Sequence, residues 1–232
     1  MIQRKAPKVP TDPAFLFDLD GTLVDSVYQH VLSWKEALDA QGIQLSVWRI
    51  HRKIGMSGGL FTNQLLRETG AVISQERVEL LQRSHAEAFG RRAQTVCPLP
   101  GACELLSWLT EARIPWAVAT SGRMETARVS LDRLGIDPKR VPVITRDVVR
   151  YAKPSPDLFI AAAERLGVSI GTAIVVGDSI WDMLAATRCR ALGVGVLSGG
   201  YGAEELRQAG AIRVYEDPAD LLGHIDEVDG RR

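Results

Sequence analysis

The sequence has few cysteines, and this scarcity limits the kinds of protein that it can encode. Cys97, Cys103 and Cys189 are the only three among 232 residues. An odd, widely spaced set forms neither a disulfide framework nor a zinc site with paired ligands. We therefore expect a protein of a reducing compartment in which these cysteines are small buried side chains.

The sequence also lacks an excess of charge and any long apolar run. Lys and Arg together number 28, as do Asp and Glu, so the formal net charge is zero. Nucleic acids and anionic membranes are bound through a clustered basic excess, which argues against both as partners. No stretch approaches the ~18 consecutive apolar residues that cross a bilayer. Residues 1–13 are basic and contain prolines but no apolar core, so we expect a flexible leader of a cytoplasmic protein rather than a secretory signal.

Short apolar runs are present and predict buried strands. Hydrophobic residues make up 46% of the chain, enough for a core of ordinary size without disulfides or metals. Runs that are apolar on both faces are typical of a parallel sheet covered by helices. The predicted strands are Ala14–Phe17, Pro115–Ala119, Val141–Thr145, Thr172–Val176 and Ala191–Leu197, with Ala211–Tyr215 as a possible edge strand.

Helical patterns lie between these runs. Strands that alternate with helices form βαβ units, so the sequence predicts an α/β protein with a doubly wound, Rossmann-like parallel sheet. The predicted helices of this core are Ala102–Ala112, Glu125–Leu134, Pro156–Leu166 and Ser179–Cys189.

The interval 25–97 breaks this alternation because it has helical patterns and no convincing strand. An interval of this length is too long for a loop in a compact domain. We therefore predict a helical domain, residues 25–97, inserted after the first strand of a core formed by residues 1–24 and 98–232. Its predicted helices are Val27–Ala40, Ser46–Lys53, Leu60–Glu68 and Gln75–Arg92.

Two aspartates follow the first predicted strand. Asp18 and Asp20 are two residues apart, so in extended chain their side chains point the same way, and Gly21 permits a sharp turn after them. Ligands bind at this end of the strands in open α/β sheets. Two adjacent carboxylates need a cation, a shared proton or solvent. A D-x-D-G run by itself is also compatible with a simple turn.

Three further motifs follow in a fixed order and complete a family pattern. Residues 15–24, F-L-F-D-L-D-G-T-L-V, resemble the first motif of the haloacid dehalogenase superfamily. The others are Thr120 in A-V-A-T-S-G, Lys153 in A-K-P-S-P-D-L-F, and Asp178 and Asp182 in V-V-G-D-S-I-W-D. The resemblance extends from about residue 14 to 222 and is closest to the phosphoglycolate phosphatase and β-phosphoglucomutase-like subgroup, in which a type I helical cap follows the first strand.

This resemblance implies a Mg²⁺-dependent phosphatase that acts on small phosphomonoesters. Asp18 would be the nucleophile that becomes an aspartyl-phosphate, and Asp20 the general acid and base. Mg²⁺ would be held by Asp18, by the main-chain carbonyl of Asp20 and by Asp178, with Asp182 at the metal or its waters.

The same resemblance assigns the groups that bind the phosphate. Thr120 would offer its hydroxyl, Ser121 and Gly122 their backbone N–H groups, and Lys153 its charge. Structural roles compete at each position when it is taken singly. Thr120 or Asp178 could cap a helix, Lys153 could be a surface lysine, and Asp182 could pair with a surface arginine.

The specificity loop of the family's cap has its best match in residues 51–59, H-R-K-I-G-M-S-G-G. Arg52 and Lys53 are candidates to bind a carboxylate or second polar group of the substrate, and Arg123 is a further one. This would suit phosphoglycolate. Alternatively, the basic residues complement the dipole at a solvated helix end.

Other activities remain open. A phosphomutase has the same aspartates and a similar cap, whereas a 2-haloacid dehalogenase or a phosphonatase would lack Asp20. A receiver module is usually about half as long and has no cap, and a decayed family member would have lost motif residues. We expect a monomer or homodimer.

Overall fold

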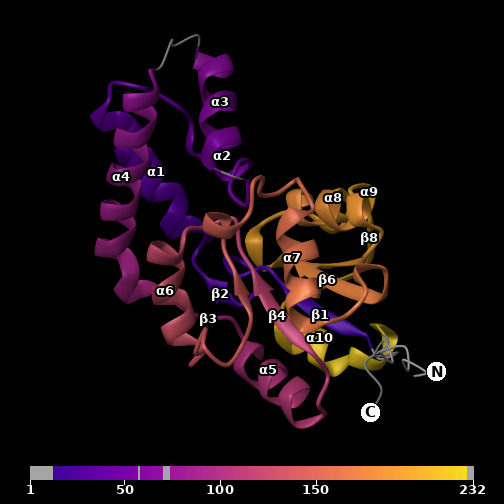
Figure 1. The fold of residues 1–232 in the computed structure, drawn as a ribbon. Helices are drawn as coiled ribbons and strands as arrows, with labels where there is room; N and C mark the ends of the chain where they lie inside the picture. The colour runs from indigo at the N-terminus through magenta and orange to yellow at the C-terminus, as the bar shows by residue number, and fades with distance from the viewer. Residues whose placement is uncertain (1–12, 57, 70–73, 229–232) are drawn as a thin grey trace, which may run out of the picture.

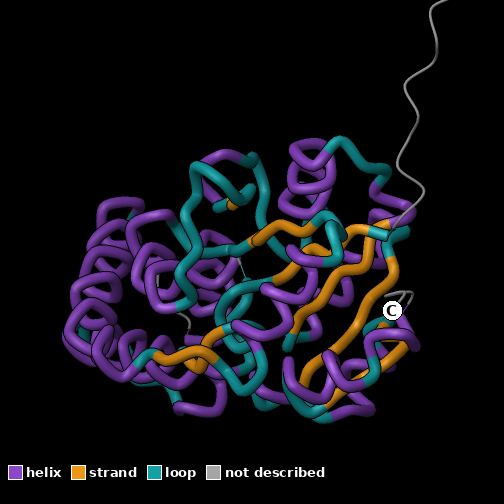
Figure 2. The backbone as a smooth tube through the Cα atoms, turned by 90° about the horizontal axis from the view of Figure 1, so that it is seen from below, coloured by secondary structure: helices purple, strands orange, loops and turns teal. Residues whose placement is uncertain are grey.

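The computed structural model describes residues 13–56, 58–69 and 74–228. The predicted leader lies outside these residues except for its last position. A six-stranded sheet occupies the centre of the molecule, with all neighbouring strands parallel and in the order β5-β4-β1-β6-β7-β8 (Figures 1 and 2). The strands are β1 Ala14–Phe17, β4 Trp116–Ala119, β5 Val143–Ile144, β6 Ala173–Gly177, β7 Leu192–Val196 and β8 Ala211–Tyr215.

Strand β1 lies at the middle of the sheet and is buried on both faces. Phe15 and Phe17 point to one face and Ala14 and Leu16 to the other, and all four are fully buried. Alternation along an extended chain explains how one strand supplies two separate cores. The larger core contains Phe15 and Phe17, and the other core contains Ala14 and Leu16.

Helices cover both faces of the sheet (Figure 2). Helices α5, α6 and α10 pack on the face with the phenylalanines, and α7 and α8 on the other. This confirms the predicted doubly wound α/β fold. The helices are α5 Ala102–Glu111, α6 Met124–Arg133, α7 Asp157–Leu166, α8 Ile180–Cys189, α9 Ala203–Gln208 and α10 Pro218–Gly223. Short 3₁₀ turns are η1 Ala93–Thr95, η2 Arg146–Val148, η3 Ile170–Thr172, η4 Leu197–Gly199 and η5 Ile225–Val228.

A two-stranded ribbon separates the sheet from four inserted helices. Strand β2, Val24–Asp25, pairs antiparallel with β3, Cys97–Pro98. Between them the chain forms helices that stand to one side of the sheet (Figure 1). They are α1 Val27–Ala40, α2 Val47–His51, α3 Gly58–Thr69 and α4 Gln75–Arg92. Trp34 of α1, Phe61 of α3 and Leu81 of α4 are buried together in a core of their own.

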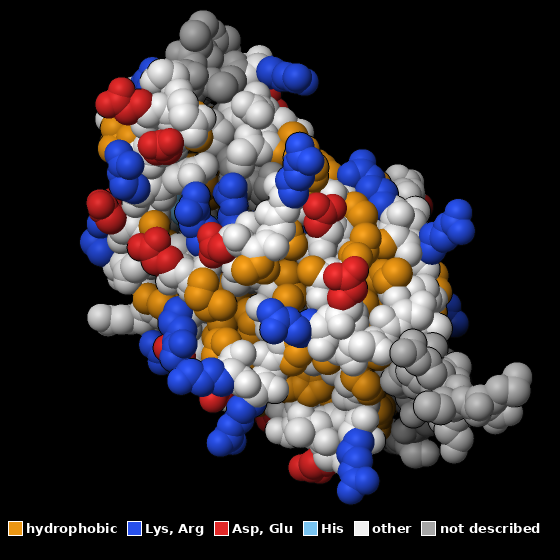
Figure 3. All heavy atoms as spheres, viewed as in Figure 1, with side chains coloured by type: hydrophobic (Ala, Val, Ile, Leu, Met, Phe, Trp, Pro, Cys, Tyr) orange, Lys and Arg blue, Asp and Glu red, His pale blue; other side chains and the backbone are white. Residues whose placement is uncertain are grey.

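The cysteines depart from the sequence expectation. Cys97 and Cys103 are exposed, Cys189 is half-buried, and all three are free thiols, so the prediction of three buried cysteines is wrong. Cys97 lies on the narrow ribbon and Cys103 on the outer side of α5, where no second layer covers them. Within the described ranges, no helix is both long and apolar enough to cross a membrane. Acidic and basic side chains are interspersed on the face shown in Figure 3, as the balanced charge predicts.

We predict that Gly101→Ala destabilises the fold more than Gly135→Ala. Both glycines have a positive φ, 74° and 68°, so alanine costs about 1–2 kcal/mol of backbone strain at either site. An added Cβ at Gly101 would lie 2.4 Å from the Ala219 Cα of α10, whereas none of the described atoms lies within 4 Å at Gly135. Overpacking adds about 1–3 kcal/mol at Gly101 alone. Urea denaturation measures both, and equal losses would contradict the packing argument.

Candidate active site

The motif residues lie at the carboxyl ends of three adjacent strands. Asp18 follows β1, Thr120 follows β4 and Asp178 follows β6, and β1 pairs with both β4 and β6. Side chains far apart in the sequence are therefore brought to one edge of the sheet, at the position where α/β proteins bind ligands.

Three carboxylates form a compact buried cluster at this edge. One oxygen each from Asp18, Asp178 and Asp182 lies within 4.8 Å of the others. The exposed fractions of these residues are only 3%, 4% and 0%. Lys153, which is fully buried, forms an ion pair with Asp18, and its Nζ lies 2.7 Å from Asp182 Oδ1.

The cluster has more negative charge than its lysine can neutralise. Burial raises the pKa of Asp18 to about 7, with Lys153 lowering it and Asp182 raising it. Burial and the charges of Asp182 and Asp18 hold the pKa of Asp178 well above its usual range. Burial lowers the pKa of Lys153, but Asp18 and Asp182 outweigh this and raise it. Another cation at this cluster would therefore favour the ionised forms of Asp18 and Asp178.

The surroundings of Asp178 suit a small divalent cation. An added Cβ at Gly199 would lie 1.7 Å from Asp178 Oδ2, and one at Gly21 would lie 2.6 Å from the same atom. Two glycines thus let the backbone approach this buried carboxylate closely. The remaining oxygen, Oδ1, accepts a hydrogen bond from Thr22 Oγ1 at 3.1 Å. Buried carboxylate oxygens are the ligands that Mg²⁺ prefers, so the residues present fit this ion.

Asp182 does not pair with a surface arginine, the competing role considered above. Its Oδ2 accepts hydrogen bonds from the Ser179 backbone N at 3.2 Å and from Ser179 Oγ at 2.6 Å. Ser179 is the N-cap of α8, so Asp178 is not. Both aspartates are thus held at the first turn of α8 with carboxylate oxygens directed at the cluster.

The side chain of Asp20 turns away from this cluster toward the inserted helices. Its Oδ1 accepts a hydrogen bond from Ser26 Oγ at 2.6 Å and lies 3.4 Å from His30 Nε2. Burial alone would raise the pKa of Asp20, but the charge and hydrogen bond of His30 and the hydrogen bond of Ser26 together lower it. Of the two carboxylates at the end of β1, one faces the cluster and the other faces His30.

His30 and His85 are site residues that the sequence analysis missed. His30 Nδ1 lies 3.1 Å from His85 Nε2. Burial and the charge of His30 hold the pKa of His85 well below its usual range, which favours neutral His85. A neutral imidazole can accept a hydrogen bond from His30 Nδ1–H. The ring of His30 stacks on that of Phe89, with 3.9 Å between their centroids. The ring of His85 stacks on that of Trp34, with 4.2 Å between their centroids. Helical spacing could have placed each histidine on a buried face, but their contact joins α1 to α4 and has no local signature.

The turn after β4 provides hydrogen-bond donors. Gly122 N donates to Thr120 Oγ1 at 3.0 Å, and Arg123, rather than Thr120, is the N-cap of α6. The hydroxyl oxygen of Ser121 is buried and has no hydrogen-bond partner within the described ranges. A buried hydroxyl without a partner is costly unless a ligand satisfies it.

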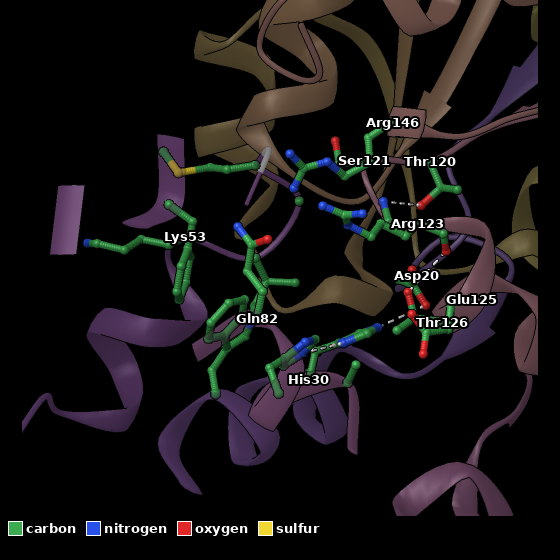
Figure 4. Close-up of a pocket in the computed structure, with 18 of the residues that line it drawn as sticks. Asp20, His30, Lys53, Gln82, Thr120, Ser121, Arg123, Glu125, Thr126 and Arg146 are labelled. Atoms are coloured by element: carbon green, nitrogen blue, oxygen red, sulfur yellow. Dashed lines mark hydrogen bonds and ion pairs between the residues drawn. The ribbon is translucent and has the colours of Figure 1, made fainter. Parts of the chain in front are cut away.

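A cavity of about 540 Å³ separates the sheet edge from the inserted helices. Trp34, Ile54, Met56 and Phe61 give it an apolar wall on the side of the insertion. The opposite wall carries the residues that follow β1 and β4, with the side chains of Arg123 and Arg146 extending into the space (Figure 4). The cavity thus joins the charged cluster to a partly apolar compartment.

Of the two basic residues predicted to bind the substrate, one lines the cavity and the other does not. Arg52 does not line this cavity; its guanidinium pairs with Glu205 and lies 4.1 Å over the ring of Tyr201. Lys53 does line the cavity, with its Nζ 2.7 Å from Glu68 Oε1. Arg52, predicted as a substrate ligand, thus contacts Glu205 and Tyr201 and is not among the residues that line this cavity. Ser57 of this loop lies outside the described residues.

Comparison with known proteins yields consistent matches. Residues 13–190 match the model of a haloacid dehalogenase-like hydrolase. Hexitol phosphatase A of Escherichia coli is 33% identical over 78% of this chain and 82% of its own. A phosphoglycolate phosphatase of Agrobacterium fabrum is 30% identical over 82% of each chain. A solved hydrolase structure from Pseudomonas syringae has a TM-score of 0.93 and 55% identity, covering 94% of this chain and 100% of its own.

We predict that His30→Gln raises the pKa of Asp20. The substitution keeps a hydrogen-bond donor but removes the positive charge that lowers this pKa. Carboxyl-carbon NMR titration of Asp20 measures the shift. His224→Gln is the control, because His224 is an exposed histidine that pairs with Asp220 on α10. An unchanged titration of Asp20 in His30→Gln would show that His30 does not act on it electrostatically.

We also predict that Mg²⁺ raises the melting temperature, and that the rise grows between about pH 5 and pH 7.5. Without the ion, folded Asp18 keeps its proton up to about pH 7, whereas its ordinary pKa is 3.8. The stability from this proton is lost as the pH rises through that window, and Mg²⁺ replaces the proton. At about 100 times its dissociation constant, the ion adds about 2.7 kcal/mol.

Calorimetry with and without Mg²⁺ across this pH range tests the linkage. Asp178→Asn is the matched variant, because asparagine can still accept the hydrogen bond of Thr22 while losing the charge. We expect it to abolish most of the shift. A Mg²⁺ effect that is absent in the wild type, or independent of pH, would exclude the carboxylate cluster as its binding site.

Proposed function

Because this chain belongs to the haloacid dehalogenase-like hydrolases, we propose that it is a Mg²⁺-dependent phosphatase that hydrolyses small organic phosphomonoesters through a phosphorylated Asp18. The hydrolysis of phosphoric monoesters follows from the family and from its phosphatase-named relatives. The ion, the residue roles and the substrate class are the proposed parts.

One observation carries the residue assignment. Lys153 pairs with Asp18 and Asp182 at a buried edge where Asp178 adds a third carboxylate. A surface lysine has no reason to be buried among aspartates, whereas phosphoryl transfer requires positive charge beside an anionic nucleophile. Lys153 would neutralise Asp18 before the reaction and a phosphoryl oxygen during it.

The proposed reaction has two halves. In the first, an oxygen of Asp18 forms a bond to phosphorus while the bond from phosphorus to the substrate oxygen breaks, and Asp20 gives that oxygen a proton. His30 Nε2, 3.4 Å from Asp20 Oδ1, can give Asp20 this proton before the first half and take it back after the second. In the second half, Asp20 takes a proton from water, whose oxygen displaces the phosphoryl group from Asp18. The hydroxyls of Thr120 and Ser121 and the Gly122 N–H would hold the phosphoryl oxygens.

Mg²⁺ would be held by Asp18, the main-chain carbonyl of Asp20 and Asp178, with Asp182 beside it. When bound, it offsets the repulsion between the anionic nucleophile and the anionic phosphate. The chain itself supplies the other groups that attract the phosphate, which are the charge of Lys153 and the hydrogen-bond donors that follow β4.

We further propose that residues 25–97 form a cap on a core of residues 1–24 and 98–232. The ribbon of β2 and β3 marks the two crossings between them. The cap contributes an apolar wall to the cavity and contacts the core through Arg52, Glu205 and Tyr201. Its role would be to exclude water from the phosphoryl group during transfer.

The cavity favours a substrate larger than phosphoglycolate. Arg52 and Lys53, on which the phosphoglycolate hypothesis depends, are paired with Glu205 and Glu68. A cavity of about 540 Å³ is within the range of ~300–1,000 Å³ that holds drug-sized ligands. A two-carbon phosphoacid would leave most of it filled with water. We therefore propose a phosphomonoester with a longer organic body, such as a sugar or polyol phosphate.

The nucleophile is tested by Asp18→Asn. We expect phosphate release to fall to below about a thousandth of the wild-type rate, because the covalent route is lost. The fold should persist, since asparagine has nearly the same shape. Beryllium fluoride with Mg²⁺ should modify Asp18 in the wild type only. Asp132→Asn, on the exposed outer side of α6 and paired with Arg128, is the control and should keep full activity.

A colorimetric phosphate-release screen over phosphorylated sugars, polyols and small acids, with and without EDTA, tests the reaction itself. Near-normal turnover by Asp18→Asn would refute the assigned nucleophile, and turnover in EDTA would refute the need for the ion. A phosphomutase, the alternative activity, would instead convert a sugar phosphate to an isomer and release little inorganic phosphate.

A further inference from the structure

Two arginines lie together in the wall of the cavity. Arg123 is the N-cap of α6, and Arg146 begins η2. The backbone N of Arg146 donates to the carbonyl oxygen of Gly122 at 3.1 Å, which ties η2 to the turn after Thr120. Figure 4 shows both side chains extending from the core into the cavity, toward the region where Gln82 projects from the inserted helices.

These two guanidinium groups are poorly neutralised by the protein. Arg146 has no hydrogen-bond or ion-pair partner for its side chain within the described ranges, and Arg123 has only Asp147, with 3.9 Å between Arg123 Nη1 and Asp147 Oδ1. The other oxygen of Asp147 accepts hydrogen bonds from Met124 N at 2.8 Å and Thr145 Oγ1 at 3.2 Å. Burial, and then the like charge of Arg123, lower the pKa of Arg146, and the charge of Asp147 offsets this only in part. Two adjacent cations in this position favour an anion between them.

The transferred phosphoryl group has other ligands. Lys153 pairs with Asp18, and the proposed ion and the hydroxyls after β4 would complete the surroundings of the phosphoryl group. The two arginine side chains extend from the wall that carries Thr120 and Ser121 into the cavity, away from Asp20 (Figure 4). Asp18 and both arginines line the same cavity, so one substrate can reach the nucleophile with its phosphate and the arginines with its other end.

We propose that Arg123 and Arg146 form an anion subsite for a second negatively charged group of the substrate, a carboxylate or another phosphate. The proposal rests on the proposed function and narrows its substrate to a phosphomonoester with an anionic group at the far end. Such a substrate would place its organic body between the two anionic ends, along the apolar wall formed by Trp34 and Phe61.

Acidic residues of the cavity only weakly offset the attraction of the two arginines for an anion. Glu79, Glu87 and Glu125 also line the cavity, but like Arg123 all three are exposed, so solvent screens these charges. Arg146 is half-buried and less well hydrated, so its attraction for a ligand inside the cavity is stronger.

Matched substrates test the subsite. Gluconate 6-phosphate and glucitol 6-phosphate differ only in a carboxylate or a hydroxymethyl group at the far end, and 3-phosphoglycerate and glycerol 3-phosphate form a shorter pair. We expect the wild type to favour the carboxylate member of its better-used pair by about tenfold or more in kcat/KM, since charge-assisted hydrogen bonds have this magnitude. The carboxylate member should differ from the neutral one mainly by a lower KM, because the carboxylate is bound equally before and during phosphoryl transfer.

Arg146→Gln and Arg123→Gln should each remove most of this preference while changing kcat/KM for the neutral member less than about threefold, and Arg146→Lys should restore part of it. Arg128→Gln is the matched control, because Arg128 lies on α6 but is exposed, pairs with Asp132 and does not line the cavity. Thermal melts of each variant confirm the fold.

The outcomes separate the two proposals. Phosphate release without preference for the carboxylate member, or an equal loss for both members in Arg146→Gln, would overturn the subsite and leave the phosphatase standing. The equal loss would place Arg146 at the transferred phosphoryl group. No release from any phosphomonoester would refute the proposed function, and the subsite with it.

Discussion

The site depends on one buried ion cluster, in which Lys153 lies between Asp18 and Asp182 beside a third carboxylate, Asp178. Removing charges from water is costly unless each is paired, so such a cluster stabilises a fold weakly and is better explained by function. The excess of negative charge in this cluster also indicates a functional role rather than a stabilising one. Proton uptake by Asp18 or Asp178 would relieve it in the absence of a cation, and a divalent ion would relieve it while keeping Asp18 ionised as a nucleophile.

The two aspartates at the end of β1 show how the surroundings separate the pKa values of identical side chains. Burial beside other carboxylates raises the pKa of Asp18, whereas His30 and Ser26 lower that of Asp20. His30 belongs to α1, so the environment of Asp20 is made partly by the inserted helices. The insertion therefore does more than cover the cavity. It supplies an imidazole, backed by His85, that acts on a group of the core.

The same insertion shows why single residues mislead when their contacts are unknown. Arg52 is basic and lies in a glycine-rich loop, the features expected of a substrate ligand, yet it packs on Tyr201 and pairs with Glu205. Arg146, which no motif contains, extends into the cavity and has no ion-pair partner among the described residues. The local sequence gives both residues the same chemistry. Only their neighbours distinguish a contact that joins two parts of the chain from one that faces a ligand.

The sequence by itself determined the strands of the sheet and the positions of the polar residues at their carboxyl ends. Apolar runs such as 14–17 and 173–176 can only be buried, and polar residues at their ends, Asp18 and Asp178, must then lie at a common edge. Burial and strand direction are local consequences of side-chain type, so they can be inferred without coordinates. The His30–His85 contact, the pairing of Arg52 and the position of Arg146 were decided by tertiary structure alone. Each depends on how two elements distant in the sequence pack together, and no spacing along the chain encodes that geometry.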